Sequence, residues 1–180
     1  MSQKVLILSA SPRKNGNSDM LCDRFMAGAQ DAGNQVEKIR LQEKNIAFCQ
    51  GCLACQGNGG ACVQNDDMAE ILEKMIRADV LVMATPIYFY NMDAQLKVLI
   101  DRTCPRYTEI ANKKAFFIAT SWDERREAMD VAIAGFRGFL ACLNNVEEAG
   151  IICATGVEHG GDIEGKPEMT IAYEMGKTVI

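Results

Sequence analysis

VLILSASPRKNGNS, residues 5–18, is the stretch that decides the fold of this chain. It begins with four consecutive apolar residues, Val5–Leu8, which have the length and composition of a strand buried on both faces. A polar turn containing Gly16 follows, and Asn17 and Ser18 are suited to begin a helix. The apolar residues of that helix recur at helical spacing: Met20, Leu21, Phe25 and Ala29. A buried strand, a polar turn and an amphipathic helix predict the first half of a βαβ unit.

The remainder of the chain repeats this alternation. Apolar runs at 80–84, 115–119 and 151–154 predict three more buried strands, and residues 36–41 predict a weaker one, suited to an edge. Helical patterns lie between or after them, at 68–76, 96–100, 132–140 and about 168–177. This order predicts an α/β fold, a doubly wound five-stranded parallel sheet with helices on both faces. No repeat or linker interrupts residues 1–180, so we expect a single domain, with one long irregular loop at about 45–65.

The amino-acid composition excludes several classes of function. The 180 residues are 48% hydrophobic and 24% charged, which supports a full core and excludes wholesale disorder. A net charge of -5 argues against a nucleic-acid partner. No apolar run reaches the roughly 18 residues that a membrane span requires, and no signal-peptide pattern follows Met1. We therefore expect a cytoplasmic protein that binds neither nucleic acid nor membrane.

Ligands of open α/β sheets bind beyond the carboxyl ends of the strands, so the residues that follow each strand are the candidates for chemistry. The loop after the first strand, residues 9–18, is rich in hydroxyl groups, carries Arg13 and opens a helix. Helix N–H groups and the helix dipole favour an anion there. The loop lacks the dinucleotide and NTPase glycine motifs, so a small phosphate monoester fits it better.

Aromatic residues follow two other strands. Residues 85–92 contain two tyrosines, a phenylalanine and a methionine after a proline, and the single tryptophan, Trp122, follows the strand at 115–119. Apolar side chains at a strand end suit the walls of a site for a flat aromatic ligand. An anion cradle beside aromatic walls indicates a heterocycle that carries a phosphate, and FMN is the simplest such molecule.

These residues also resemble a known family. The pattern Ser9-x-Ser11-x-Arg13-x-x-Gly16-Asn17-Ser18 is similar to the FMN phosphate loop of the NADPH-dependent FMN reductase family, which has a flavodoxin-like fold. Further motifs that resemble the family are Asp66-Asp67-Met68, Ala78-Asp79, Thr85-Pro86-Ile87-Tyr88, Leu96-Lys97 and Asp101-Arg102. The likeness is close over residues 3–122 and looser beyond.

The resemblance assigns residues to the cofactor. It implies that the FMN phosphate is held by the first loop: Ser9, Ser11, Arg13, Gly16, Asn17 and Ser18. It implies that the isoalloxazine ring lies against the other two loops: Pro86, Ile87, Tyr88, Phe89, Asn91, Thr120, Ser121 and Trp122. Since the flavin carries the redox chemistry, no general acid or base is assigned, and His159 is expected to have no role.

Eight cysteines are unusual for such a chain, and four of them are clustered. Cys49, Cys52, Cys55 and Cys62 have the spacing C-x2-C-x2-C-x6-C, and four thiolates are the ligand set of a [4Fe-4S] cluster. The fourth cysteine follows after six residues, where bacterial ferredoxins have three, so a zinc site and free thiols remain open as alternatives. The insert also resembles the iron–sulfur flavoprotein branch of the family. The other four are expected to be ordinary core or surface residues: Cys22, Cys104, Cys142 and Cys153.

Two functions are consistent with these patterns. The first is an FMN-dependent NAD(P)H oxidoreductase that reduces a small acceptor such as a quinone, a flavin, an azo compound or a nitro compound. The alternative is an electron-transfer module that links ferredoxin-like donors to acceptors through a [4Fe-4S] cluster and FMN. The resemblance further implies a homodimer or homotetramer, with residues 102–112 as an interface or lid.

Overall fold

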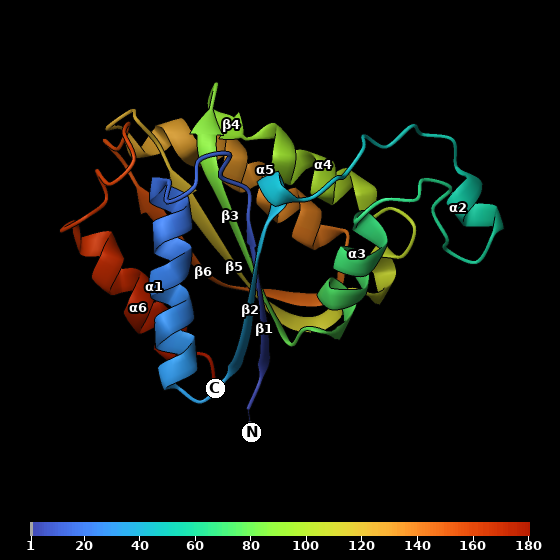
Figure 1. The fold of residues 1–180 in the computed structure, drawn as a ribbon, viewed down its shortest axis with the longest axis horizontal. Coiled ribbons are helices and arrows are strands. Elements are labelled where there is room, and N and C mark those ends of the chain that lie inside the picture. Colours follow the sequence, from blue (N-terminus) through green and yellow to red (C-terminus); the bar gives the residue numbers. More distant parts are fainter. Residues whose placement is uncertain (1) are drawn as a thin grey trace.

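The computed structural model describes residues 2–180 and has an α/β architecture with one central sheet (Figure 1). Five parallel strands form that sheet in the order β2-β1-β3-β5-β6. Their bounds are β1 (Lys4–Ser9), β2 (Gln35–Arg40), β3 (Val80–Tyr88), β5 (Ala111–Thr120) and β6 (Asn144–Ala154). The α-helices are α1 (Asn17–Asp31), α2 (Ala54–Gly57), α3 (Met68–Arg77), α4 (Ala94–Arg102), α5 (Asp130–Ala141) and α6 (Pro167–Lys177). Short 3-10 turns occupy Leu41–Glu43, Tyr107–Glu109 and Arg126–Met129.

The predicted sheet is confirmed in its parallel strands and corrected in their number. A sixth strand, β4 (Asn91–Met92), pairs antiparallel with the end of β3. The sequence analysis expected five strands and assigned residues 85–92 to a loop. The expectation missed β4 because a two-residue strand leaves no periodic pattern, and it ended β3 at Ala84 because the apolar run stops there. β3 instead continues through Tyr88, paired with β5 as far as Pro86.

Two apolar layers enclose the sheet, one on each face. α1 and α6 cover one face, where Phe25 and Ala172 pack with Ile7. α3, α4 and α5 cover the other face, where Leu72, Leu96 and Phe136 pack with the opposite side chains of the strands. Figure 1 shows the two groups of helices on either side of the strands. β1, β3 and β5 are covered on both faces, so the side chains on both faces are buried. Their sequences are therefore continuously apolar and do not alternate between apolar and polar residues.

The segment between the first 3-10 turn and α3 lies apart from these layers. Apart from the four-residue helix α2, residues 44–67 have no regular helix or strand, and Figure 1 shows them projecting from the α3–α4 side of the sheet. This segment contains the predicted cysteine loop. Within residues 2–180, none of the helices is long and apolar enough to cross a membrane.

Candidate functional site

The sheet register brings the three predicted loops to one edge. Ser9 pairs with Ala84, Pro86 with Thr120, and Thr120 with Ala154, so β1, β3, β5 and β6 end at nearly the same level. The N–H of Ala10 donates to the carbonyl of Ala84 at 2.9 Å, which holds the first loop beside β3 after β1 has ended. The carboxyl edge of the sheet is therefore the floor of the candidate site, as expected for this architecture.

The first loop is a compact turn that ends at the N-terminus of α1. The Ser11 hydroxyl accepts from the N–H of Arg13 at 3.2 Å and donates to the carbonyl of the same residue at 3.1 Å. Gly16 precedes the helix, and a Cβ at Gly16 would lie 2.5 Å from Ser11 Oγ. That separation is far below a van der Waals contact, and the carbonyl of Arg13 would lie 3.2 Å away, so a side chain here would displace the Ser11 hydroxyl and crowd the turn.

The first turn of α1 fits a phosphate. Gly16 is the N-cap residue of α1 and has no side chain that could bond to the helix. The first backbone N–H groups of α1 are therefore available to a ligand. Ser18 Oγ is fully buried and finds no hydrogen-bond partner among residues 2–180. A buried hydroxyl without a partner is costly unless a ligand or water satisfies it. Helix N–H groups, the dipole of a 15-residue helix and this hydroxyl together match the oxygens of a phosphate monoester.

Not every predicted residue of the loop faces a ligand. The Ser9 hydroxyl is buried and donates to Asp19 Oδ1 at 2.7 Å, which ties the end of β1 to the first turn of α1. Asp19 also lies 3.2 Å from Lys38 Nζ and 3.5 Å from Arg40 Nε, both on β2. Burial lowers the pKa of Lys38, but bonding to Asp23 and Asp19 outweighs it and leaves that pKa raised. This ion cluster beneath the loop was missed by sequence reasoning because it depends on β2 lying beside β1.

Two other predicted phosphate residues contact the loop that follows β6. Arg13 Nη1 donates to the carbonyl of Glu158 at 2.6 Å, and Asn17 Nδ2 donates to the carbonyl of His159 at 2.9 Å. Asn17 Oδ1 also accepts from the N–H of Ile163 at 3.3 Å. The late loop therefore forms one wall of the site through its backbone. The His159 side chain is exposed and takes no part in these contacts.

The aromatic run after β3 forms a hairpin. Phe89 and Tyr90 have φ angles of 48° and 63° and connect β3 to β4 as a two-residue turn. Positive φ at both central residues is the geometry of the type I′ hairpin, which glycine and asparagine usually supply. Aromatic side chains rarely adopt this conformation, so the backbone is strained there. Strain of this kind concentrates at ligand-binding and active sites.

The strained turn presents aromatic surface to solvent. Phe89 is 100% exposed, and Trp122 on the loop after β5 is 72% exposed. Tyr90, which the sequence analysis did not list, accepts a 3.3 Å hydrogen bond from Arg125, and Arg125 forms an ion pair with Asp123. Thr120 and Ser121 are buried at the base of this loop, where Ser121 Oγ accepts from the N–H of Asp123 at 3.0 Å. Exposed aromatic rings beside the proposed phosphate site are suited to bind a flat ligand.

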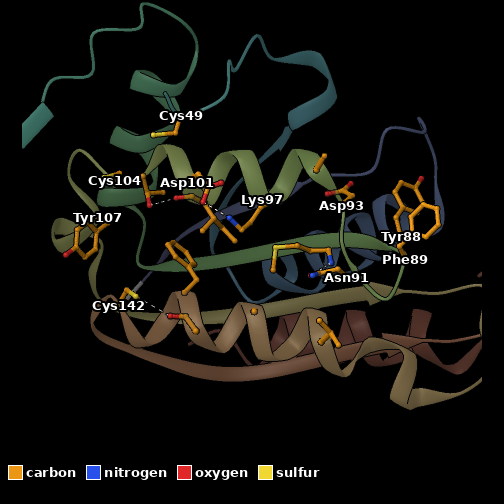
Figure 2. Close-up of a pocket in the computed structure, with 18 of the residues that line it drawn as sticks. Cys49, Tyr88, Phe89, Asn91, Asp93, Lys97, Asp101, Cys104, Tyr107 and Cys142 are labelled. Carbon is orange, nitrogen blue, oxygen red and sulfur yellow. Dashed lines mark hydrogen bonds and ion pairs between the residues drawn. The ribbon is translucent and has the colours of Figure 1, made fainter. Parts of the chain in front are cut away.

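An apolar groove begins at this hairpin and runs between α4 and α5 (Figure 2). Its volume is about 1370 Å³, and Tyr88, Phe89 and Asn91 line one end. Cys49, Cys104 and Cys142 line the other end. The groove thus joins the predicted ring-binding loop to the cysteine segment.

Asp93 lies in the floor of this groove and was not foreseen. It precedes α4, and its Oδ1 accepts from the N–H of Leu96 at 3.0 Å. Its other carboxyl oxygen is buried and finds no partner within the described chain. Burial raises the pKa of Asp93 to about 7, against the lowering effect of its bonds to Leu96 and Thr85. The signal in the sequence was Asp93 placed just before a helical pattern, which is typical of an N-cap.

Arg102, at the end of α4, anchors the cysteine segment. Its side chain is 2% exposed, and the guanidinium donates to both carboxyl oxygens of Asp66 at 2.7 and 2.9 Å and to the carbonyl of Ala47 at 2.6 Å. These bonds close the two ends of the segment onto α4. Burial alone raises the pKa of Asp66, but the hydrogen bonds from Arg102 outweigh it and leave that pKa lowered.

The four predicted cysteines line one small cavity of about 50 Å³. A fifth, Cys104, lines the same cavity from the turn after α4. Burial raises the pKa of the Cys104 thiol, and the neighbouring thiols of Cys55, Cys49 and Cys62 raise it further. Within residues 2–180, no three His, Cys, Asp or Glu side chains converge closely enough to hold a metal ion. The donor types fit a thiolate-bound metal centre, although their arrangement is not assembled around one.

Comparison with known proteins agrees with this geometry. Residues 3–140 match the family model of the NADPH-dependent FMN reductases. An iron-sulfur flavoprotein of Archaeoglobus fulgidus is 37% identical over 102 residues, which are 57% of this chain and 46% of that protein. An iron-sulfur flavoprotein of Methanosarcina thermophila is 37% identical over 100 residues, 56% of this chain and 52% of that protein. The chain spans about half the length of these curated relatives.

Two further likenesses extend over more of the chain. A Bacillus subtilis protein named as an NAD(P)H-dependent FMN-containing oxidoreductase is 31% identical over 129 residues, 67% of each protein. The fold is that of an NAD(P)H:quinone oxidoreductase of Methanothermobacter marburgensis, with a TM-score of 0.78 at 20% identity over 98% of this chain and 96% of that one. This structural likeness establishes the flavodoxin-like architecture.

Proposed function

The chain belongs to the NADPH-dependent FMN reductase family, and on that premise we propose that it is an FMN-dependent oxidoreductase that passes electrons from NAD(P)H to a small acceptor. The observation that carries the proposal is the gathering of three loops at the carboxyl edge of the sheet. One loop offers a helix N-terminus and the partnerless Ser18 hydroxyl, and two offer exposed aromatic rings.

Residues of the first loop bind the FMN phosphate in this proposal. The first N–H groups of α1 and the Ser18 hydroxyl would donate hydrogen bonds to the phosphate oxygens, and Ser11 and Gly16 shape the turn around them. Arg13 turns from the Glu158 carbonyl toward the phosphate and adds a charge-assisted hydrogen bond. Ser9 acts indirectly, because its hydroxyl fixes Asp19 at the start of α1. Asn17 acts in the same way through the late loop.

The hairpin and the loop after β5 orient the ring. Pro86, Ile87 and Tyr88 form the end of β3 and would hold one side of the ring, and the strained turn exposes Phe89, against which a flat ligand could lie. Asn91 lines the adjoining groove, and Thr120, Ser121 and Trp122 close the third side. When bound, FMN supplies the hydride and electron chemistry, and the protein binds, orients and excludes water.

The test is direct. The full chain should bind FMN with quenching of flavin fluorescence, and the loaded protein should oxidise NADH or NADPH in the presence of a soluble quinone. Ser18→Ala should weaken FMN binding by about tenfold, the effect of one lost charge-assisted hydrogen bond. A matched control is Ser2→Ala, which changes an exposed serine at the end of β1 opposite the phosphate loop. Absence of FMN binding by the unaltered protein would refute the proposal.

The cysteine cavity favours a second function, the transfer of electrons through a metal cluster and FMN with a ferredoxin-like donor. Its support is that cysteines of one segment line a single cavity and that relatives carry the name iron-sulfur flavoprotein. Anaerobic reconstitution with iron and sulfide, followed by electron paramagnetic resonance of the reduced protein, tests it. A cluster signal supports this function, and its absence leaves the NAD(P)H reaction as the proposal.

The open groove favours self-association. An apolar groove of about 1370 Å³ adjoins a fully exposed phenylalanine beside the ring-binding loops. Large exposed apolar patches mark interaction surfaces, so a homodimer or homotetramer that covers this face is part of the proposal. Light scattering of the FMN-loaded protein gives the assembly size, and a monomer at all concentrations would contradict it.

A further inference from the structure

Cys104 lies outside the clustered cysteines in the sequence but beside them in the fold. It follows α4, whereas Cys49, Cys52, Cys55 and Cys62 belong to the segment before α3. All five line the cavity of about 50 Å³ described above. In the sequence nothing distinguishes Cys104 from Cys142, because Cys104 lies 42 positions after Cys62.

The backbone holds Cys104 firmly at this position. Thr103 is buried, and its hydroxyl donates to the carbonyl of Ile100 at 2.7 Å. The N–H of Arg106 donates to the carbonyl of Thr103 at 3.0 Å, which closes the turn on the other side of Cys104. The thiol is therefore carried by a hydrogen-bonded turn on a packed helix, not by the irregular segment.

The cysteine segment is pressed against this turn at two places. Arg102 binds Ala47 and Asp66, the two ends of the segment. In the middle, a Cβ at Gly60 would lie 2.9 Å from Arg106 Cγ and 3.1 Å from the carbonyl of Pro105, so only glycine allows the approach. The segment cannot move far from Cys104 without breaking these contacts.

Arg102 also brings a positive charge to the cavity. Its Nη2 donates to Cys62 Sγ at 3.7 Å while its other bonds hold Asp66. A guanidinium aimed at sulfur stabilises a thiolate, and a centre with several thiolates carries excess negative charge. Hydrogen bonds to ligating groups orient the ligands and tune the metal. A buried cation that contacts one thiol of a five-thiol cavity is therefore suited to a metal centre.

From this arrangement we propose that Cys104 is a ligand of a thiophilic metal centre in this cavity, together with cysteines of the 49–62 segment. The three cysteines of C-x2-C-x2-C lie within one short segment, residues 49–55. A thiol from a separate element approaches from another direction and completes a tetrahedral set. The cavity holds a few water-sized groups, so the side chains can turn into it without displacing helices. The inference requires neither FMN binding nor NAD(P)H oxidation.

The experiment uses Co²⁺ as the probe on the reduced, full-length chain without oxygen. Tetrahedral thiolate coordination gives Co²⁺ intense visible bands and thiolate charge-transfer absorption. Cys104→Ser should weaken Co²⁺ binding by about tenfold or more and lower the charge-transfer absorbance by about a quarter, one thiolate of four. Cys104→Ala should behave in the same way, because both variants remove the thiol.

Cys142→Ser is the matched control, since Cys142, like Cys104, is exposed and lines the groove, but it does not line the cysteine cavity. It should bind Co²⁺ as the unaltered protein does. Circular dichroism and FMN affinity should be unchanged in all three variants, which separates ligand loss from misfolding. The inference is overturned if both Cys104 variants keep the affinity and spectrum of the unaltered protein, or if the unaltered protein gives no thiolate–cobalt absorption.

Discussion

Two loops of this chain have similar chemical importance and opposite construction. They are the phosphate loop, residues 9–18, and the cysteine segment, residues 44–67. The first is short, begins at the end of a buried strand and ends in a long helix. Several of its side chains are already bonded, as in the Ser9–Asp19 contact at 2.7 Å, while the Ser18 hydroxyl has no partner within the described chain. The second is long, almost without regular structure, and is held chiefly at its ends by Arg102.

The two loops therefore differ in whether the binding site is formed before its ligand binds. Helix N–H groups are fixed by the helix itself, so an anion site can be complete before the anion arrives. Thiol side chains on an irregular segment gain their arrangement from the metal, and binding energy is then partly folding energy. The phosphate loop is therefore expected to lose affinity when altered, and the cysteine segment to lose structure.

The largest expected effect comes from Arg102→Ala. Removing one partner of the buried Arg102–Asp66 pair leaves Asp66 charged and unpaired, which costs about 3–5 kcal/mol of unfolding free energy. Urea denaturation measures it, and limited proteolysis should show cleavage within residues 44–67. The control is Arg137→Ala, which breaks the exposed pair with Glu148 and should cost less than about 1 kcal/mol. Equal losses in both variants would show that Arg102 does not anchor the segment.

Arg13→Ala acts on the other loop and should affect binding rather than stability. It removes a charge-assisted contact to the FMN phosphate, on the order of 1.5–3 kcal/mol of binding free energy. Because the Arg13 side chain is exposed, its bond to Glu158 adds little to folding. Fluorescence titration with FMN measures the loss, and unchanged affinity would remove Arg13 from the site.

A pair of glycine substitutions compares the two loops directly. Gly16→Ala places a Cβ 2.5 Å from Ser11 Oγ, so the turn must shift and FMN affinity should fall by about tenfold, roughly 1.4 kcal/mol. Gly57→Ala in the cysteine segment meets nothing within 4 Å and should leave FMN affinity unchanged. If both variants bind FMN alike, the close approach at Gly16 is not needed for the cradle.

The last prediction is a pH dependence of stability from Asp93, which is measured as a slope and not as a loss of binding. Its folded pKa is raised to about 7 by burial, whereas an unfolded aspartate titrates near 4. The folded protein binds more protons between these values, so stability falls as pH rises from about 4 to 7, by at most about 1.4 kcal/mol per pH unit. Asp93→Asn keeps the cap on α4 but should flatten this slope in urea denaturation. A slope that persists in the variant would assign it to another group.

Much of the fold was predictable because strands that are buried on both faces appear in the sequence as continuous apolar runs. The apolar runs at 5–8, 80–84 and 115–119 lie within strands β1, β3 and β5, since these strands are covered on both faces. Residues 144–150 of β6 were not predicted as strand, because that part of the edge strand is largely polar and none of it is fully buried. β4 and the strained turn at Phe89 and Tyr90 left no signal, because aromatic residues are not typical of a type I′ turn.

The sequence by itself determined the parallel sheet, the helix that follows a polar turn, and the spacing of four thiols, because each depends on residues close together in the chain. Only the tertiary structure decided that Asp19 lies against Lys38 and Arg40, that Asp93 is buried beside the groove, and that Cys104 lies with the clustered cysteines. These contacts join segments that the sheet order and helix packing bring together. Their chemistry arises from burial and neighbouring charge, which local sequence does not contain.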